Sequence, residues 1–210
     1  MVLKTYQIDE ASFGTIKAEP LTPESFADFG GIISPDHQVS CNSNQQAANY
    51  GTATKILKVA PIINNYSNAP SHLPATANWN IFRCSPPNHL IEYGKEKREN
   101  IYRSKVLERH PFSTQAFVPI GKDKSCIGYL VIVAKSLEED EQKLPDLSTM
   151  KAFLCKGNQA VTYGVGTWHA PMIALEDTLD FGVLIHENGV QDEDCQECYL
   201  EPCIKIEFSL

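Results

Sequence analysis

Short segments in which apolar and polar residues alternate dominate the chain after residue 50. The clearest is 78–84, where Trp79 and Ile81 fall on one face and Asn80 and Phe82 on the other. Similar segments, separated by turn signals, are 52–59, 104–110, 114–120, 127–135, 151–157, 159–164, 168–175, 179–187 and 203–208. Many short strands at this spacing predict an all-β (mainly) sandwich or barrel.

One short helix is predicted near the start of the chain. Thr22 is a favoured N-cap residue, Pro23 suits the first helical position, and Gly30 suits the end. Phe26 and Phe29 lie three residues apart and can share one face. The expected helix therefore presents two aromatic side chains to a core.

Few other helical signals interrupt the strands. The segment 145–153 fits one helical turn capped by Asp146 or Ser148. The polar segments 37–50, 64–77 and 138–146 are predicted to be loops. Because neither a repeat nor a clear linker divides the chain, residues 1–210 are expected to form a single domain.

Composition narrows the class of protein. The chain has 210 residues, 42% of them hydrophobic and 21% charged, as in an ordinary soluble domain. A net charge of -8 argues against nucleic acid as a partner, and the absence of long apolar runs argues against a membrane partner. The first residues lack the apolar core of a secretory signal, so a cytoplasmic location is expected.

The seven cysteines are expected to be reduced thiols. Cys84 and Cys155 lie in apolar segments and are predicted to be small core residues. The cluster in 192–203 is a weak zinc candidate, because neither a second CxxC nor a histidine pair follows it. The acidic tail 189–203 is predicted to be a solvated segment.

Four polar residues stand out against the strand pattern. Glu108 and His110 are two apart, so they face the same side of one strand, and Gln115 begins the next strand. His169 follows a glycine-rich turn at 164–167. This layout resembles the cupin pattern, in which two histidines and a glutamate from one strand pair meet a third histidine after a later turn.

Two departures from the cupin pattern affect the chemistry. Glu108 stands where a histidine is usual, and Gln115 stands where a glutamate is usual. A neutral amide is a poor metal ligand. Glu108, His110 and His169 can hold a divalent metal, or the histidines can act as acid and base without one.

Structural roles compete with these chemical ones. His110 precedes a proline and fits a turn residue, while Trp168 before His169 fits a core tryptophan beside an exposed histidine. Arg83 fits an edge charge whose head reaches water. Glu108 fits a surface ion pair with Arg109 or Lys105.

Long stretches of the sequence resemble the ureidoglycolate lyase family, most closely its fungal type. The resemblance is carried by 21–36, 49–59, 78–84, 108–121, 145–175 and 180–188. It implies a cupin-like double-stranded β-barrel that acts as a homodimer in allantoin (purine) breakdown and nitrogen metabolism. It also implies cleavage of (S)-ureidoglycolate to glyoxylate and urea, and a possible divalent metal, nickel or zinc.

The resemblance places roles on individual residues. His169 or His110 is expected to be the base, with Glu108 orienting it or binding a metal. Arg83 is expected to grip the substrate carboxylate, and Gln115 to hydrogen-bond the ureido group. The other expected substrate contacts are Trp168, Lys55 and Asn49.

Other functions also fit these residues. One is a non-catalytic cupin-like protein that binds a small acid, and another is an amidohydrolase that releases ammonia from ureidoglycolate. A metal-dependent isomerase or dioxygenase needs three strong ligands, and Gln115 in a glutamate position argues against it.

Overall fold

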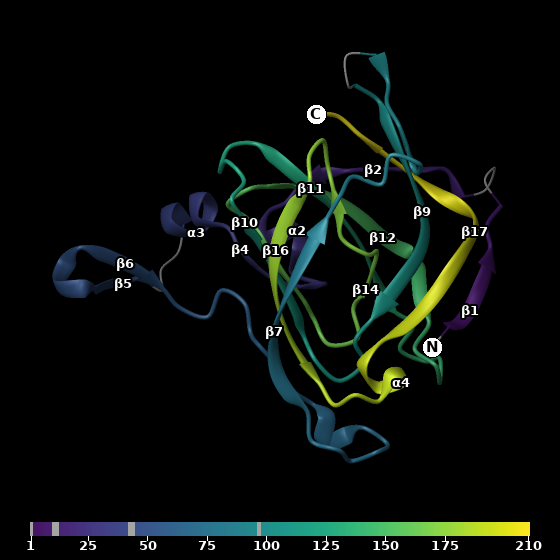
Figure 1. Cartoon of the computed structure of the whole chain (residues 1–210), viewed down its shortest axis with the longest axis horizontal. Helices are drawn as coiled ribbons and strands as arrows, with labels where there is room; N and C mark the ends of the chain where they lie inside the picture. Colours follow the sequence, from purple (N-terminus) through teal and green to yellow (C-terminus); the bar gives the residue numbers. More distant parts are fainter. Residues whose placement is uncertain (1, 10–12, 42–44, 96–97) are drawn as a thin grey trace.

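The computed structural model describes residues 2–9, 13–41, 45–95 and 98–210, and its architecture is mainly β (Figure 1). The larger sheet runs in the order β1 (Val2–Gln7), β17 (Gln196–Phe208), β9 (Asn100–Arg109), β14 (Trp168–His169), β11 (Ile127–Ser136), β12 (Pro145–Lys156) and β3 (Glu19–Pro20). Paired beside β17, β9 and β11 are β2 (Thr15–Lys17), β8 (Ile91–Glu92) and β15 (Ile173–Ala174).

The smaller sheet has the order β4 (Gly30–Ile33), β13 (Ala160–Tyr163), β10 (Gln115–Ile120), β16 (Leu179–Glu187) and β7 (Thr76–Cys84). A separate hairpin joins β5 (Gln45–Ala48) to β6 (Ala53–Ile56). The short helical elements are α2 (Pro23–Phe26), α3 (Pro35–Cys41), η1 (Asn49–Gly51), η2 (Tyr66–Asn68) and α4 (Gln191–Asp194).

The two main sheets pack face to face around a shared core. Along β11, Tyr129 and Val131 face the smaller sheet, while Leu130 and Ile132 face the other way. The ring of Tyr129 meets that of Phe181 on β16 edge to face, with ring centroids 5.2 Å apart. The expected all-β, cupin-like class is confirmed, although the described strands form two sheets rather than one closed barrel.

A second core lies on the far face of the larger sheet. Trp168, Ile132 and Ile206, from three different strands, are buried in it. β2 pairs with β17, and β3 pairs with β12 only a residue further along the chain. The start of the chain thus connects two strands that are distant in the sheet order, and this curls the larger sheet around its own core.

The predicted N-terminal helix is confirmed. The Thr22 side chain accepts a hydrogen bond from the Ser25 N–H at 3.1 Å, and the Ser25 hydroxyl oxygen accepts one from the Thr22 N–H at 3.1 Å. Phe26 and Phe29 are both buried in the core between the sheets, and Phe26 lies 5.5 Å from the ring of Phe153.

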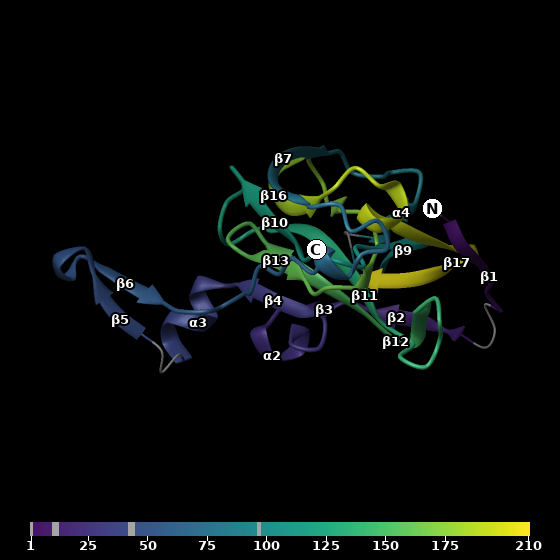
Figure 2. The ribbon, with the colours of Figure 1, turned by 90° about the horizontal axis from the view of Figure 1, so that it is seen from below.

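Two predictions near residues 37–50 and 145–153 are wrong. The segment 145–153 belongs to strand β12, because its pairing with β11 along most of its length outweighs the local turn signal. Asp146 still accepts a hydrogen bond from the Ser148 N–H at 3.0 Å, so the turn chemistry survives inside the strand. The supposed loop 37–50 contains most of α3 and the first strand of a hairpin that extends away from the body (Figures 1 and 2).

The tail 189–203 is also not a solvated segment. Its second half begins β17, which lies between β1 and β9 in the larger sheet. Cys198 and Leu200 are buried, while Tyr199 and Glu201 between and beyond them are exposed. This alternation is a normal strand pattern that the acidic and cysteine residues conceal.

No helix in the described part of the chain is long and apolar enough to cross a membrane.

Candidate active site

Three strands and one glycine turn bring four of the predicted residues together between the sheets. Glu108 on β9 is the register partner of His169 on β14, so the two side chains are direct neighbours. His110 follows the end of β9, and Gln115 begins β10 in the facing sheet. The turn before His169 is held against β9 by Gly166, whose N–H donates to the His110 carbonyl at 2.9 Å.

His169 is buried and closely held, with 1% of its surface exposed. Tyr163 stacks on its ring, with centroids 3.9 Å apart and an angle of 10° between the planes. Nδ1 lies 3.0 Å from the Thr167 carbonyl oxygen, which can only accept, so Nδ1 carries a proton. Nε2 faces Oε1 of Gln115 at 3.2 Å and points into the site.

His110 presents its second nitrogen to the same space. Nδ1 lies 2.6 Å from the Asp194 carbonyl oxygen and therefore donates to it. Nε2 is buried without a hydrogen-bond partner, and the ring centroid lies 5.4 Å from that of His169. Burial, reinforced by His169, lowers the pKa of His110, which favours a neutral imidazole with its lone pair on Nε2.

Glu108 supplies a negative charge to the cluster. Its Oε1 lies 3.5 Å from Nε2 of His169. Burial disfavours the carboxylate, but the hydrogen bond and charge of His169, together with His110, outweigh it and lower the pKa of Glu108. Glu108 is therefore ionised at neutral pH.

These three side chains fit a divalent metal ion. Glu108, His110 and His169 each offer one ligand atom, and the three atoms lie within 4.8 Å of one another. Both histidines are fixed through Nδ1 by backbone carbonyls, as metal-binding histidines usually are. The unpartnered Nε2 of His110 is the kind of buried atom that an ion would satisfy.

The side chains of Trp168 and His169 lie on opposite faces of the larger sheet. Successive residues of a strand point to opposite faces, and Trp168 is buried in the core on the far side of the larger sheet. There its Nε1–H donates to the Lys143 carbonyl at 2.9 Å, and the Arg109 guanidinium lies over its ring at 4.9 Å. Of the two roles foreseen for Trp168, its position supports core filling.

Arg83, Lys55 and Asn49 are not brought to the cluster within one chain. Arg83 lies on β7 opposite Asp180, to which it donates two hydrogen bonds at 2.8 and 2.9 Å, and its side chain is 74% exposed. It shares the outer face of the smaller sheet with Ile81. Lys55 and Asn49 lie on the β5–β6 hairpin and its tip, which extend away from the body (Figure 1).

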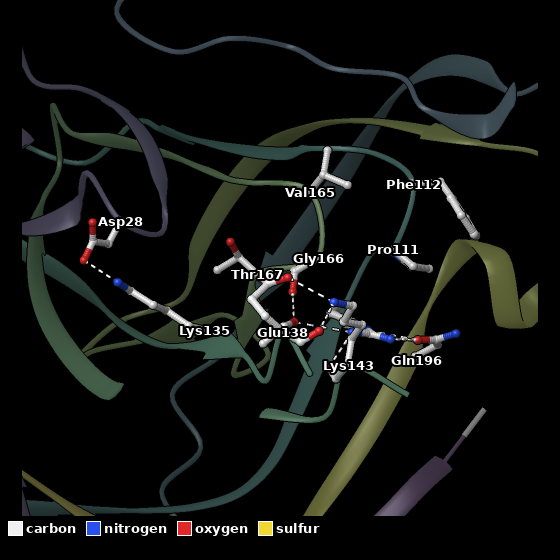
Figure 3. Close-up of a pocket in the computed structure, with 12 residues that line it drawn as sticks. Asp28, Pro111, Phe112, Lys135, Glu138, Lys143, Val165, Gly166, Thr167 and Gln196 are labelled. Atoms are coloured by element: carbon white, nitrogen blue, oxygen red, sulfur yellow. Dashed lines mark hydrogen bonds and ion pairs between the residues drawn. The ribbon is translucent and has the colours of Figure 1, made fainter. Parts of the chain in front are cut away.

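A cavity of about 560 Å³ is lined in part by Val165, Gly166 and Thr167 of the turn that precedes His169 (Figure 3). Pro111 and Thr167 line it, but the Glu108, His110, His169 and Gln115 side chains do not. Two of its lysines are already paired: Lys135 with Asp28 at 2.6 Å and Lys143 with Glu138 at 3.0 Å.

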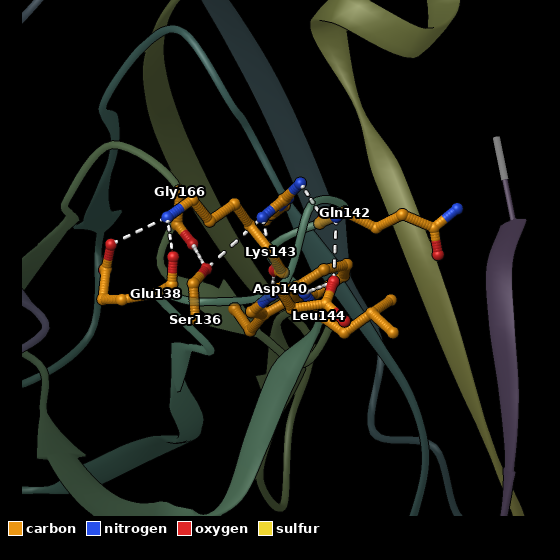
Figure 4. A network of polar contacts seen from close by, with 9 residues as sticks. Ser136, Glu138, Asp140, Gln142, Lys143, Leu144 and Gly166 are labelled. Atoms are coloured by element: carbon orange, nitrogen blue, oxygen red, sulfur yellow. Dashed lines mark hydrogen bonds and ion pairs between the residues drawn. The ribbon is translucent and has the colours of Figure 1, made fainter.

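Residues that line the cavity also hold the 164–167 turn in place. The Ser136 hydroxyl donates to the Gly166 carbonyl at 2.9 Å, within the network that surrounds Lys143 (Figure 4). The Arg109 guanidinium also donates to Ser136 and to the Gln142 and Lys143 carbonyls. These contacts fix the 164–167 turn and thereby the start of β14.

Sequence reasoning missed Asp194 and Tyr163. Asp194 lies in the tail that was predicted to be solvated, and its backbone carbonyl, not its side chain, reaches His110. A backbone contact leaves no signal in residue type. Tyr163 had a signal, because it precedes the glycine turn at the end of a predicted strand, yet stacking on His169 requires knowledge of how the turn folds.

A two-sheet β fold with a glutamate and two histidines clustered between the sheets is the arrangement of a cupin-like protein. Residues 13–207 match the sequence profile of the ureidoglycolate lyase family. The chain belongs to this family.

Curated relatives agree with the family match. The ureidoglycolate lyase of Saccharomyces cerevisiae is 48% identical over 192 residues, which cover 89% of this chain and 93% of the yeast protein. That of Schizosaccharomyces pombe is 37% identical over 195 residues, 91% of this chain and 96% of the relative. A bacterial ureidoglycolate lyase, from Pseudomonas paraeruginosa, is 31% identical over 185 residues, 87% and 89% of the two chains.

Proposed function

We propose that this chain is a carbon–nitrogen lyase that splits (S)-ureidoglycolate into glyoxylate and urea in allantoin breakdown. Family membership over residues 13–207, with named relatives covered almost end to end, supports the reaction. The observation that carries the site is the pair of histidines, each tied to a backbone carbonyl through Nδ1 and each directing Nε2 into one space beside Glu108.

The reaction needs one base and one acid. The reacting carbon of ureidoglycolate carries a hydroxyl, a carboxylate and a ureido nitrogen. A base takes the hydroxyl proton, the oxygen electrons form the aldehyde carbonyl of glyoxylate, and the carbon–nitrogen bond breaks. An acid then delivers a proton to the departing nitrogen, giving urea. Since atoms balance without water, the step is an elimination and not a hydrolysis.

We assign the base to His110 and the acid to His169. His110 has a lone pair on an unpartnered Nε2, which suits proton removal. His169 is surrounded by oxygen acceptors: the Thr167 carbonyl at Nδ1, and Gln115 and Glu108 at Nε2. These acceptors hold a proton on Nε2 in a position from which it can pass to the departing nitrogen. Gln115 can then hydrogen-bond the ureido group.

A divalent ion, nickel or zinc, would be held by Glu108, His110 and His169. When bound, it supplies a Lewis acid that draws electron density from substrate oxygens. In that state Asp194 and Thr167, by fixing the Nδ1 protons of His110 and His169, present both Nε2 lone pairs to the ion, and these two atoms then act as ligands instead of as base and acid.

Glu108→Gln tests metal binding directly. We expect wild-type protein dialysed against zinc to retain the ion, and the variant to retain far less, because a neutral amide is a weaker ligand than a carboxylate. Metal content is measured by mass spectrometry, with Glu197→Gln as the control because Glu197 lies on β17 beside Glu108. Equal retention by wild type and Glu108→Gln removes Glu108 from the ligand set.

We also propose that the chain acts as a homodimer through the outer face of the smaller sheet. Trp79, Ile81 and Ile120 lie on this face with 66%, 79% and 54% of their surfaces exposed. Trp79 and Ile120 both lie over Gly182, so these side chains form one apolar patch. Contiguous exposed apolar patches mark protein–protein contacts. Arg83 shares this face with Ile81, so its guanidinium would lie at the dimer interface.

Ile81→Asp is expected to give a monomer, because the buried carboxylate would have no partner in an apolar interface. Sedimentation of the purified variant measures this against wild type. Val2→Asp is the control, since Val2 is also exposed but lies on β1 of the other sheet. A dimer that survives Ile81→Asp unchanged excludes this face.

A further inference from the structure

The acidic turn at α4 lies directly behind His110. The Asp194 carbonyl accepts the Nδ1 proton of His110 at 2.6 Å, while Nε2 of the same ring is buried and turned toward Glu108 and His169. α4 has only four residues, so its own backbone hydrogen bonds do little to fix its position. The Asp194 carbonyl nevertheless lies within hydrogen-bond distance of Nδ1 of His110. Other contacts must therefore hold α4 in place.

The side chain of Asp194 supplies part of that rigidity. Its two carboxylate oxygens accept from the N–H groups of Asn188 and Gly189 at 2.9 and 2.8 Å. The Tyr66 hydroxyl also donates to Asp194, at 2.5 Å. Burial and the Asp194 carboxylate raise the pKa of Tyr66 well above its usual value, so this hydroxyl keeps its proton.

Glu193 ties the same turn to the 66–72 segment. Its carboxylate accepts from the Ser71 N–H at 2.7 Å, the Ser71 hydroxyl at 2.6 Å and the Asn188 side-chain amide at 2.7 Å. Glu193 is almost fully buried. A buried carboxylate is tolerated when it is satisfied in this way, so these contacts fix α4 against the body.

Tyr66 contacts the two segments that lie next to His110, one through Phe112 and the other through Asp194. Its ring packs on Phe112 with centroids 5.8 Å apart, and the preceding Asn65 N–H donates to the Phe112 carbonyl at 2.7 Å. Phe112 lies two residues after His110, and Asp194 provides the carbonyl behind the ring. One buried tyrosine thus holds together the chain that carries His110 and the turn that accepts its proton.

We infer that Tyr66 and the Asp194 carboxylate are positioning residues for His110, which lock its ring in the Nδ1–H tautomer and direct Nε2 toward Glu108 and His169. This inference rests on the proposed function only in making Nε2 of His110 the base. Without the lock, the ring can turn or exchange tautomers, and Nε2 then carries the proton and no longer offers a lone pair. Outer contacts of this kind affect activity or metal affinity by about 10–100-fold.

Tyr66→Phe and Asp194→Asn test the inference. For both variants we expect kcat for urea release to fall about 10–100-fold with little change in KM, because the Tyr66 hydroxyl and the Asp194 carboxylate are already hydrogen-bonded to each other and to the 188–189 backbone. We also expect the ring nitrogen shifts of His110, in ¹⁵N-histidine NMR of the protein as isolated and after chelation, to move from the Nδ1–H tautomer toward a mixture.

Matched controls separate positioning from stability. Tyr129→Phe removes another buried tyrosine hydroxyl, which donates to the Gln159 carbonyl at 2.6 Å in the core between the sheets. Asp192→Asn changes an exposed acid on the same turn as Asp194. Both controls should keep the wild-type His110 spectrum and kcat.

The His110 tautomer and kcat together decide whether Tyr66 and Asp194 position His110. An Nδ1–H tautomer that persists in both Tyr66→Phe and Asp194→Asn overturns the inference, whatever the rates, as does a tautomer change with unchanged kcat. If wild-type protein released no urea while the tautomer still shifted in the variants, the proposed function would fail and the positioning of His110 would stand.

Discussion

Replacing His169 with asparagine is expected to lower kcat for urea release from ureidoglycolate by about 10²–10⁴-fold, the usual contribution of a positioned acid or base. Asparagine keeps a polar side chain of smaller volume in the space between Tyr163 and Gln115, but its amide neither gains nor loses a proton near neutral pH. The measurement is steady-state kinetics of urea formation, with circular dichroism to establish that the fold is retained.

The matched control for this prediction is His89→Asn, because His89 is exposed and lies outside the cluster. It should retain the wild-type rate. A His169→Asn protein that is folded and turns over ureidoglycolate as fast as the control would show that His169 neither moves a proton nor binds a required metal.

Replacing Trp168 with alanine is expected to reduce the free energy of unfolding by about 3–5 kcal/mol, the usual cost of removing a large buried aromatic side chain. Trp168 is fully buried in the core of the larger sheet, and its removal also leaves the Arg109 guanidinium without its stacking partner. Denaturant unfolding measures the loss.

Trp168→Phe distinguishes the core role from a substrate contact. Phenylalanine keeps most of the packing and loses the hydrogen bond to the Lys143 carbonyl, for an expected cost of about 1 kcal/mol. Since Trp168 points away from His169, KM for ureidoglycolate should not change. A raised KM at unchanged stability would return Trp168 to the substrate pocket.

The sequence was most informative where local pattern and tertiary packing agree. The N-terminal helix can be predicted from the sequence alone because all its signals lie within one short segment. They are the capping residues Thr22 and Ser25 and the aromatic residues Phe26 and Phe29. The strand that carries Trp79 and Ile81 is readable for the same reason. Glu108 and His110 were predicted to share a face because their spacing on a strand fixes it. Gln115 and His169 were added to the cluster through the resemblance to the cupin pattern.

The sequence was least informative where distant segments decide the outcome. The segment 145–153 has the residues of a helical turn, but pairing with β11 makes it a strand. The tail after 188 has the composition of a solvated segment, yet Cys198 and Leu200 are buried and the Asp194 carbonyl holds His110. Arg83 fits both an edge charge and a group that binds the substrate carboxylate, and only its pairing with Asp180 on β16 shows that it faces outward.

We propose above that the two histidines between the sheets promote an elimination that releases urea intact. Incubating the purified protein with (S)-ureidoglycolate and quantifying both urea and ammonia tests it most directly. We expect one urea and one glyoxylate for each substrate consumed, without ammonia, and loss of both products in His169→Asn. Release of ammonia in place of urea would contradict it in favour of an amidohydrolase, and binding of the acid without any product would contradict it in favour of a non-catalytic binding protein.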